Sequence, residues 1–122
     1  MKYLDPILAA GKLVETEDVK NIFKASGYKI KSVEKWLYVN EVKAVIECVQ
    51  LERELARENI SNEEYEKLIE DNRIKRDNIN TVFRAYCEFF NVNVWFKDFF
   101  DSYMNPAYGK VSDKIYKEVY GF

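Results

Sequence analysis

The chain has 122 residues, of which 48% are apolar and 33% charged, and its formal net charge is −2. This length and composition predict a single globular domain, residues 1–122, and exclude a disordered chain. The nearly balanced charge argues against a strongly basic nucleic-acid binder and a heavily acidic DNA mimic, and the four glycines and two prolines are too few for a turn-rich β-sandwich.

The N-terminal part of the chain predicts short helices separated by glycines. Asp5 followed by Pro6 is typical of a capped helix start, and Gly11 ends this first helix after barely more than one turn. Thr16 is placed to cap a second helix, and Gly27 supplies the left-handed residue that commonly ends one. Two helices therefore precede residue 28.

Residues 17–38 have the general pattern of a helix-turn-helix, with a third helix of about residues 31–38 after the turn at Gly27. Two positions depart from the DNA-reading version of this motif. Phe23 stands where a small residue lets the helices approach, and Ser26 stands where a buried apolar residue is needed. The pattern predicts a helix corner, which either reads DNA or is purely structural.

The positive charges around this corner partly support its interpretation as a nucleic-acid interface. Residues 20–35 contain five lysines against one acid, Glu34, and lysines on one helical face can contact phosphates. The third helix, however, contains no Arg, Asn or Gln to contact base edges in the usual bidentate way. A solvated lysine face is the alternative interpretation. The candidate nucleic-acid-binding residues are Lys20, Lys24, Lys29, Lys31, Ser32 and Lys35.

Two long helices predict a hairpin over residues 41–90. Asn40 is placed to cap the first helix, of about residues 41–58, and Ser61 and Glu64 form the capping box of the second, of about residues 62–90. The first helix has two apolar stripes on roughly opposite sides, one of Val42, Val45, Ile46 and Val49 and the other of Ala44, Cys48, Leu51 and Leu55. A helix apolar on two faces lies centrally in a bundle or is covered by a partner.

The second long helix keeps one apolar register from Tyr65 to Phe90. Asn72 and Arg76 fall on this apolar stripe, where they mark either a kink or a contact with a partner. The register breaks after Asn91, which predicts a corner followed by a new helix.

The C-terminal segment, residues 93–122, is rich in aromatic side chains. A helix of about residues 93–103 is predicted to end before Pro106, and Ser112 is placed to cap a last short helix carrying Ile115, Tyr116 and Val119. Nine aromatic rings lie between residues 83 and 103, more than one small core readily absorbs. Some rings, with Trp95, Phe96 and Phe100 as the first candidates, are therefore expected to be exposed as anchors of an interface.

The first long helix and the start of the second are acidic. Nine acids stand against three bases between Glu47 and Asp71. This region predicts a negative ridge for a basic partner, or else a solvated helix surface partly neutralised by pairs such as Glu54 with Arg57 and Glu63 with Lys67. The candidate partner-binding residues are Glu52, Glu63, Glu66, Arg76, Trp95, Phe96 and Phe100.

The sequence offers little for catalysis. It contains no histidine, and its two cysteines lie within helical patterns, so the common general base and the usual zinc ligand sets are missing. No phosphate-binding glycine loop is present, and neither a cofactor nor a metal is expected. Asp5 and Pro6 interrupt any signal-peptide core, and no stretch approaches the roughly 20 apolar residues of a membrane span. The cytoplasm is the expected compartment.

These observations predict an all-α domain of five to seven helices built around a long helical hairpin. The leading hypothesis is a non-enzymatic inhibitor or adaptor that docks on a basic or apolar groove of a protein partner. Small accessory proteins of phages and other mobile elements, including inhibitors of host nucleic-acid-handling or defence proteins, share this general profile. The alternative is a helix-turn-helix regulator or packaging-type protein that binds duplex DNA, and a small helical enzyme ranks third. The exposed aromatic anchors would also serve a homodimer.

Overall fold

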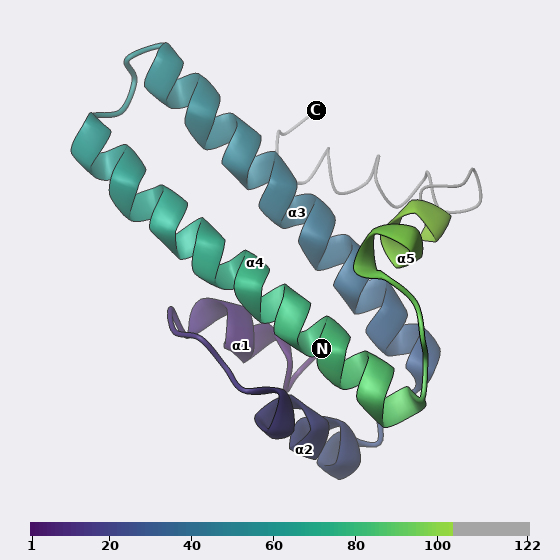
Figure 1. Cartoon of the computed structure of the whole chain (residues 1–122). Coiled ribbons are helices and arrows are strands. Elements are labelled where there is room, and N and C mark those ends of the chain that lie inside the picture. Colours follow the sequence, from purple (N-terminus) through teal and green to yellow (C-terminus); the bar gives the residue numbers. More distant parts are fainter. Residues whose placement is uncertain (104–122) are drawn as a thin grey trace.

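The computed structural model describes residues 1–103, and this part of the chain consists of α-helices and their connections, without a β-strand. The helices are α1 (Asp5–Ala9), α2 (Thr16–Ser26), α3 (Ile30–Ala56), α4 (Asn62–Phe90) and α5 (Phe96–Tyr103). The two long helices α3 and α4 run side by side in opposite directions, as Figure 1 shows. The prediction of an all-helical fold built around a long hairpin is therefore confirmed.

Local signals fix the two ends of α4. The Ser61 hydroxyl accepts a hydrogen bond from the Glu64 backbone N–H at 3.1 Å, so the predicted N-terminal cap is present. At the other end Asn91 adopts the left-handed conformation with φ of 55°, and its N–H donates to the carbonyl of Cys87. This left-handed residue produces the predicted corner after α4. The helix that follows begins at Phe96, three residues later than predicted.

The predicted helix break at Asn40 is wrong, because α3 runs without interruption from Ile30 to Ala56. The Asn40 amide does not cap a new helix. It donates to the Trp36 carbonyl one turn earlier, at 2.8 Å, so its donor is satisfied inside a continuous helix. No glycine or proline lies between residues 28 and 105 to stop the helix. The hairpin consequently begins eleven residues earlier than predicted, at Ile30 instead of residue 41.

The two N-terminal helices have the predicted extents but not the predicted N-caps. Leu4 and Glu15 occupy the N-cap positions of α1 and α2, and neither forms a side-chain cap hydrogen bond. Asp5 instead accepts a hydrogen bond from the Trp36 indole, which ties α1 to α3. Gly27 ends α2 with φ of 66°, as predicted.

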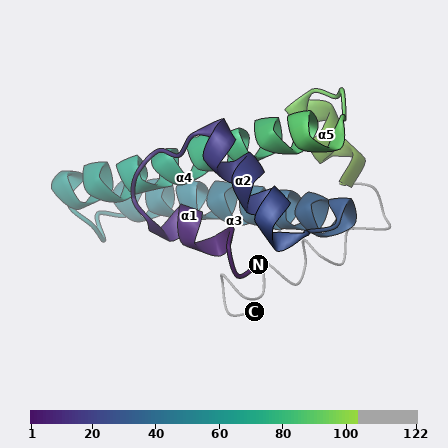
Figure 2. The ribbon, with the colours of Figure 1, turned by 90° about the horizontal axis from the view of Figure 1, so that it is seen from below.

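The core lies at one end of the hairpin. Helices α1 and α2 pack on one side of α4, while α5 lies on another side, as the two ribbon views show (Figures 1 and 2). The core residues include Leu4, Val19, Phe23, Val33, Leu37, Ile79, Val82, Phe83, Tyr86 and Phe99. The hairpin contributes to this core from the first half of α3 and the second half of α4, and α2, α5 and the residue before α1 supply the rest. The opposite half of the hairpin projects past α1, α2 and α5 in Figure 1.

Two further predictions lie outside the described residues. These are the stop before Pro106, which was to end the helix of about residues 93–103, and the last short helix capped by Ser112.

Candidate functional site

The projecting end of the hairpin carries most of the predicted negative ridge. We call residues 52–71 the acidic tip, which contains eight acids against three bases. Seven of these acids are exposed, namely Glu52, Glu58, Glu63, Glu64, Glu66, Glu70 and Asp71. Within residues 1–103, the tip acids form one ion pair, between Glu70 and Arg73 at 3.2 Å. The expected pairs of Glu54 with Arg57 and of Glu63 with Lys67 are not formed, so the negative charge is less neutralised than their spacing predicts.

Apolar side chains at the acidic tip are incompletely covered. Leu68 is 41% exposed, and Ile60 and Tyr65 are half-buried, whereas Ile69 is the one buried apolar residue of the tip. Leu68 lies one turn from both Glu64 and Asp71 along α4, so carboxylates flank it. Protein interfaces commonly have an apolar centre within a polar rim, and a partly exposed leucine between two acids has this arrangement on a small scale.

Polar side chains fasten α4 to α3 just behind the tip. The Asn72 amide is buried and donates to the carbonyl of Ala44 at 2.9 Å, and the Lys75 ammonium lies 3.2 Å from a carboxylate oxygen of Glu47. Asn72 was expected to mark a kink or a partner contact, and the structure gives it a partner within the chain. The hairpin is thus held together by specific contacts before it projects.

Arg76, a candidate partner-binding residue, also bridges the two long helices. Its guanidinium donates to one carboxylate oxygen of Glu41 at 3.4 Å, while the other oxygen of Glu41 is buried without a hydrogen bond. Burial raises the pKa of Glu41, and the attraction and hydrogen bond of Arg76 only partly oppose it.

We expect Glu41→Gln to change how stability depends on pH. Because the pKa of Glu41 is higher in the folded chain than in the unfolded chain, its contribution to the free energy of unfolding is complete below the unfolded value and is lost as pH rises through the folded value. Urea denaturation should therefore show that the wild type gains stability relative to Glu41→Gln as the pH is lowered toward the unfolded glutamate pKa of about 4.3. Glu66→Gln, which removes an exposed carboxylate of α4, is the control. Parallel profiles for wild type and Glu41→Gln would contradict this assignment.

The three aromatic candidates differ in exposure. Trp95 is 80% exposed at the corner between α4 and α5, whereas Phe96 and Phe100 are half-buried. The Phe96 ring packs against Phe83 with centroids 4.9 Å apart, and Phe100 packs against Tyr38 at 5.2 Å. Trp95 alone of the three therefore has the exposure of an anchor.

Trp95 lies far from the acidic tip. It borders a shallow pocket of about 370 Å³ at the C-terminal end of α4, lined also by Arg84, Cys87, Glu88 and Val94. The acidic tip includes the N-terminal end of the same helix (Figure 1). The structure therefore places the predicted partner-binding residues in two separate regions, with Arg76 between them.

The lysine corner is exposed around the junction of α2 and α3. Of the candidate nucleic-acid-binding residues, Lys24, Lys29, Lys31, Ser32 and Lys35 are exposed. Lys20 is engaged within the chain, because its ammonium lies 2.7 Å from Glu17 and 3.1 Å from Glu88, and hydrogen bonds to both carboxylates raise its pKa. The helix after the turn is the central α3, whose Val33, Trp36 and Leu37 are buried. The corner is therefore built into the core, and its outer side is basic.

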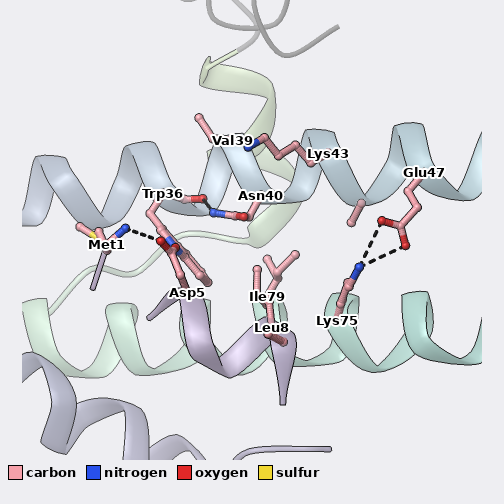
Figure 3. Close-up of a pocket in the computed structure, with 12 residues that line it drawn as sticks. Met1, Asp5, Leu8, Trp36, Val39, Asn40, Lys43, Glu47, Lys75 and Ile79 are labelled. Carbon is pink, nitrogen blue, oxygen red and sulfur yellow. Dashed lines mark hydrogen bonds and ion pairs between the residues drawn. The ribbon is translucent and has the colours of Figure 1, made fainter. Parts of the chain in front are cut away.

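A cavity of about 560 Å³ lies where α1, α3 and α4 meet (Figure 3). Asp5 accepts hydrogen bonds from the Trp36 indole at 2.7 Å and from the N-terminal ammonium at 2.8 Å. Burial alone would raise the pKa of Asp5, but these hydrogen bonds outweigh it and lower the pKa below its ordinary value. The rim includes Asn40, Lys43 and the Glu47–Lys75 ion pair, above an apolar floor that includes Leu8, Ala44 and Ile79.

Both carboxylates of this cavity, on Asp5 and Glu47, accept hydrogen bonds from donors of the chain itself. No local pattern of the sequence marks this cavity, because its lining comes from three helices that are far apart along the chain.

The two cysteines have the character of structural thiols. Burial raises the pKa of both Cys48 and Cys87, which keeps the thiols protonated and weakly nucleophilic at neutral pH. Within residues 1–103, no group of three or more potential ligands is arranged to hold a metal ion. In the same part of the chain, no helix has the length and apolar character needed to cross a membrane.

Comparisons with protein-family models, curated proteins and solved structures found no match to this chain.

Proposed function

We propose that this chain is a non-enzymatic binding protein, an inhibitor or adaptor, that docks its acidic tip on a basic surface of a protein partner. A groove that normally holds nucleic acid is a partner surface of this kind. The observation that carries the proposal is the acidic tip itself. It projects from the core (Figure 1), exposes seven acids of which Glu70 forms an ion pair, and places Glu64 and Asp71 one turn on either side of the exposed Leu68.

The physical chemistry of the tip favours a basic partner over a second copy of the chain. Complementary charge steers two proteins together and fixes their register, whereas like charges placed against each other are unfavourable. Two acidic tips facing each other would repel. Leu68 supplies the small apolar contact that a charged rim surrounds in a transient interface. A homodimer would instead use the exposed Trp95, which follows the opposite end of α4 in the chain.

The experiment compares two variants that change the net charge equally. The tip variant carries Glu52→Lys, Glu63→Lys and Glu66→Lys, and the control carries the same reversal at the exposed acids Asp18, Asp77 and Asp101. Partners captured by the wild type from cell lysate are purified, and their affinity is measured by calorimetry at two salt concentrations. We expect the tip variant to lose more than about tenfold in affinity, and the control to change by less than about twofold.

Two outcomes would contradict the proposal. Equal weakening by both variants would show a response to net charge alone, and unchanged binding by the tip variant would place the partner elsewhere. Leu68→Ser adds an independent measurement, because it should weaken binding at high salt, where charge steering is screened.

The DNA-binding alternative rests on the exposed lysines at the α2–α3 corner. It is tested by titrating the pure protein with duplex DNA at two salt concentrations. Binding that falls steeply with salt and is lost in Lys31→Glu with Lys35→Glu would support a DNA-binding regulator. Absence of binding at low salt would exclude it.

A further inference from the structure

Helix α4 has an exposed polar face whose charges form a symmetric pattern. Its five residues follow one another at spacings of four, three, four and four, which keeps them on one side of a helix. All five are exposed, and we call them the outer α4 face: Arg73, Asp77, Asn80, Arg84 and Glu88. From the first to the last, they are positive, negative, neutral, positive and negative. Reading the face in the opposite direction exchanges every sign.

The two charges nearest the middle of this face are unpaired in the described part of the chain. Asp77 and Arg84 are seven residues apart, which is about 10 Å along a helix and too far for an ion pair between them. Within residues 1–103, neither side chain forms an ion pair or a hydrogen bond. Arg73 and Glu88 are each held by one neighbour in the chain. The face therefore offers one free anion and one free cation to another molecule.

Trp95 stands beside the outer α4 face and is 80% exposed. The next residue, Phe96, packs on Phe83 with ring centroids 4.9 Å apart, so the chain after α4 turns back along the helix. Trp95 consequently borders the shallow pocket of about 370 Å³ together with Asn80 and Arg84. Tryptophan and arginine are the residues that most often anchor protein interfaces. The face thus combines a projecting ring with a pocket that can receive one.

A second copy of the chain complements this face when it is turned by 180°. In a two-fold dimer, a residue that contacts a second residue across the interface is contacted by that same residue in return. With the two α4 helices antiparallel and the axis beside Asn80, Asp77 of each copy lies opposite Arg84 of the other. The same register sets Arg73 of each copy opposite Glu88 of the other. Trp95 lies near this axis, where its indole can reach the pocket of the second copy.

We propose that the chain forms a two-fold dimer through the outer α4 face, with Trp95 of each copy seated in the pocket of the other. Exposed ion pairs contribute little to affinity, so they set the register, whereas burial of the two indoles supplies most of the binding. This register places residue 71 of one copy opposite residue 90 of the other. The two acidic tips therefore project past opposite ends of the dimer and do not repel each other.

The dimer does not depend on the proposed function. Each tip remains free to bind its own partner, so the affinity of one tip is the same in the monomer and in the dimer.

Sedimentation equilibrium of the full chain tests the proposal over protein concentrations of about 1 µM to about 1 mM. We expect a dimer whose population rises with concentration. Trp95→Ala should raise its dissociation constant by at least about tenfold. The control is Leu13→Ala, which shortens another exposed apolar side chain, 65% exposed, far from α4 in the sequence. It should change the dissociation constant by less than about twofold.

Exchange of the two free charges tests the register. Asp77→Arg alone, or Arg84→Asp alone, places like charges opposite each other in both symmetry-related contacts and should weaken the dimer by about fivefold or more. The two substitutions together exchange the charges and should restore the dissociation constant to within about twofold of the wild-type value. Both side chains are exposed and unpaired, so the circular dichroism spectra of all variants should superimpose.

Three outcomes would overturn the proposal. A chain that stays monomeric over the whole concentration range forms no such dimer. Undiminished association of Trp95→Ala would assign the contact to another face. Failure of the double exchange to restore association would show that Asp77 and Arg84 do not meet across a two-fold axis.

Discussion

Replacing Asn78 by aspartate should lower the free energy of unfolding by about 3 kcal/mol or more, because it buries a charge among acceptors. Asn78 is 1% exposed. Its amide nitrogen donates to the carbonyls of Lys12 at 2.8 Å and Ile7 at 3.4 Å, and its amide oxygen accepts the Val14 N–H at 3.0 Å. One side chain of α4 thus satisfies three backbone groups around the connection between α1 and α2.

Aspartate has the shape of asparagine but cannot donate when ionised, so its carboxylate would face two carbonyl oxygens. The measurement is chemical denaturation followed by circular dichroism. The control is Asn80→Asp, because Asn80 is exposed and its amide bonds only to the Arg76 carbonyl in the preceding turn. Protonation of the buried carboxyl should reduce the deficit of Asn78→Asp at low pH. Similar losses in the two variants would contradict the role assigned to Asn78.

Asn78 also shows where sequence patterns stop being informative. Its polar neighbourhood, DNRIKRDN, was compatible with the long register of α4, and the helix does run through it. The pattern could not show that the Asn78 and Asn72 amides bind backbone groups far away in sequence, because periodicity records which face a residue occupies and not what packs there. Asn40 was misread for a related reason: asparagine favours helix caps, but its amide can also bond to the preceding turn.

The sequence signals for helix ends were reliable, because helix capping depends on a few adjacent residues. The Ser61 cap, the left-handed Gly27 and the corner after Phe90 depend on a few adjacent residues, and all three are present. The acidic tip was visible as an excess of charge, but its projection from the core is a tertiary property. The sequence also could not show which aromatic side chains are exposed. Trp95 and Phe96 are neighbours in sequence, but the Phe96 ring packs on Phe83 whereas Trp95 is largely exposed.

Phe83→Ala should have a comparably large effect, lowering the free energy of unfolding by about 3 to 5 kcal/mol. Phe83 is buried, and its ring centroid lies 4.9 Å from that of Phe96 and 5.4 Å from that of Phe99. These two rings belong to α5, so Phe83 is a main side chain of α4 against which α5 packs, together with Tyr86, whose ring centroid lies 5.7 Å from that of Phe99. Its removal leaves a cavity and also removes the surface that holds α5 in place.

The control is Phe89→Ala, which deletes the same ring from the same helix at a position that is 41% exposed. Phe89 contacts Phe23 and Phe90 but no ring of α5, so we expect a loss of about 1 kcal/mol. Hydrogen exchange distinguishes the mechanisms: amides of α5 should lose protection in Phe83→Ala and keep it in Phe89→Ala. Because a typical domain is stable by about 5 to 15 kcal/mol, the Phe83 variant would lose a large share of its stability. Equal losses in both variants would mean that the aromatic cluster stabilises by total apolar area, without a specific role in binding α5 to the hairpin.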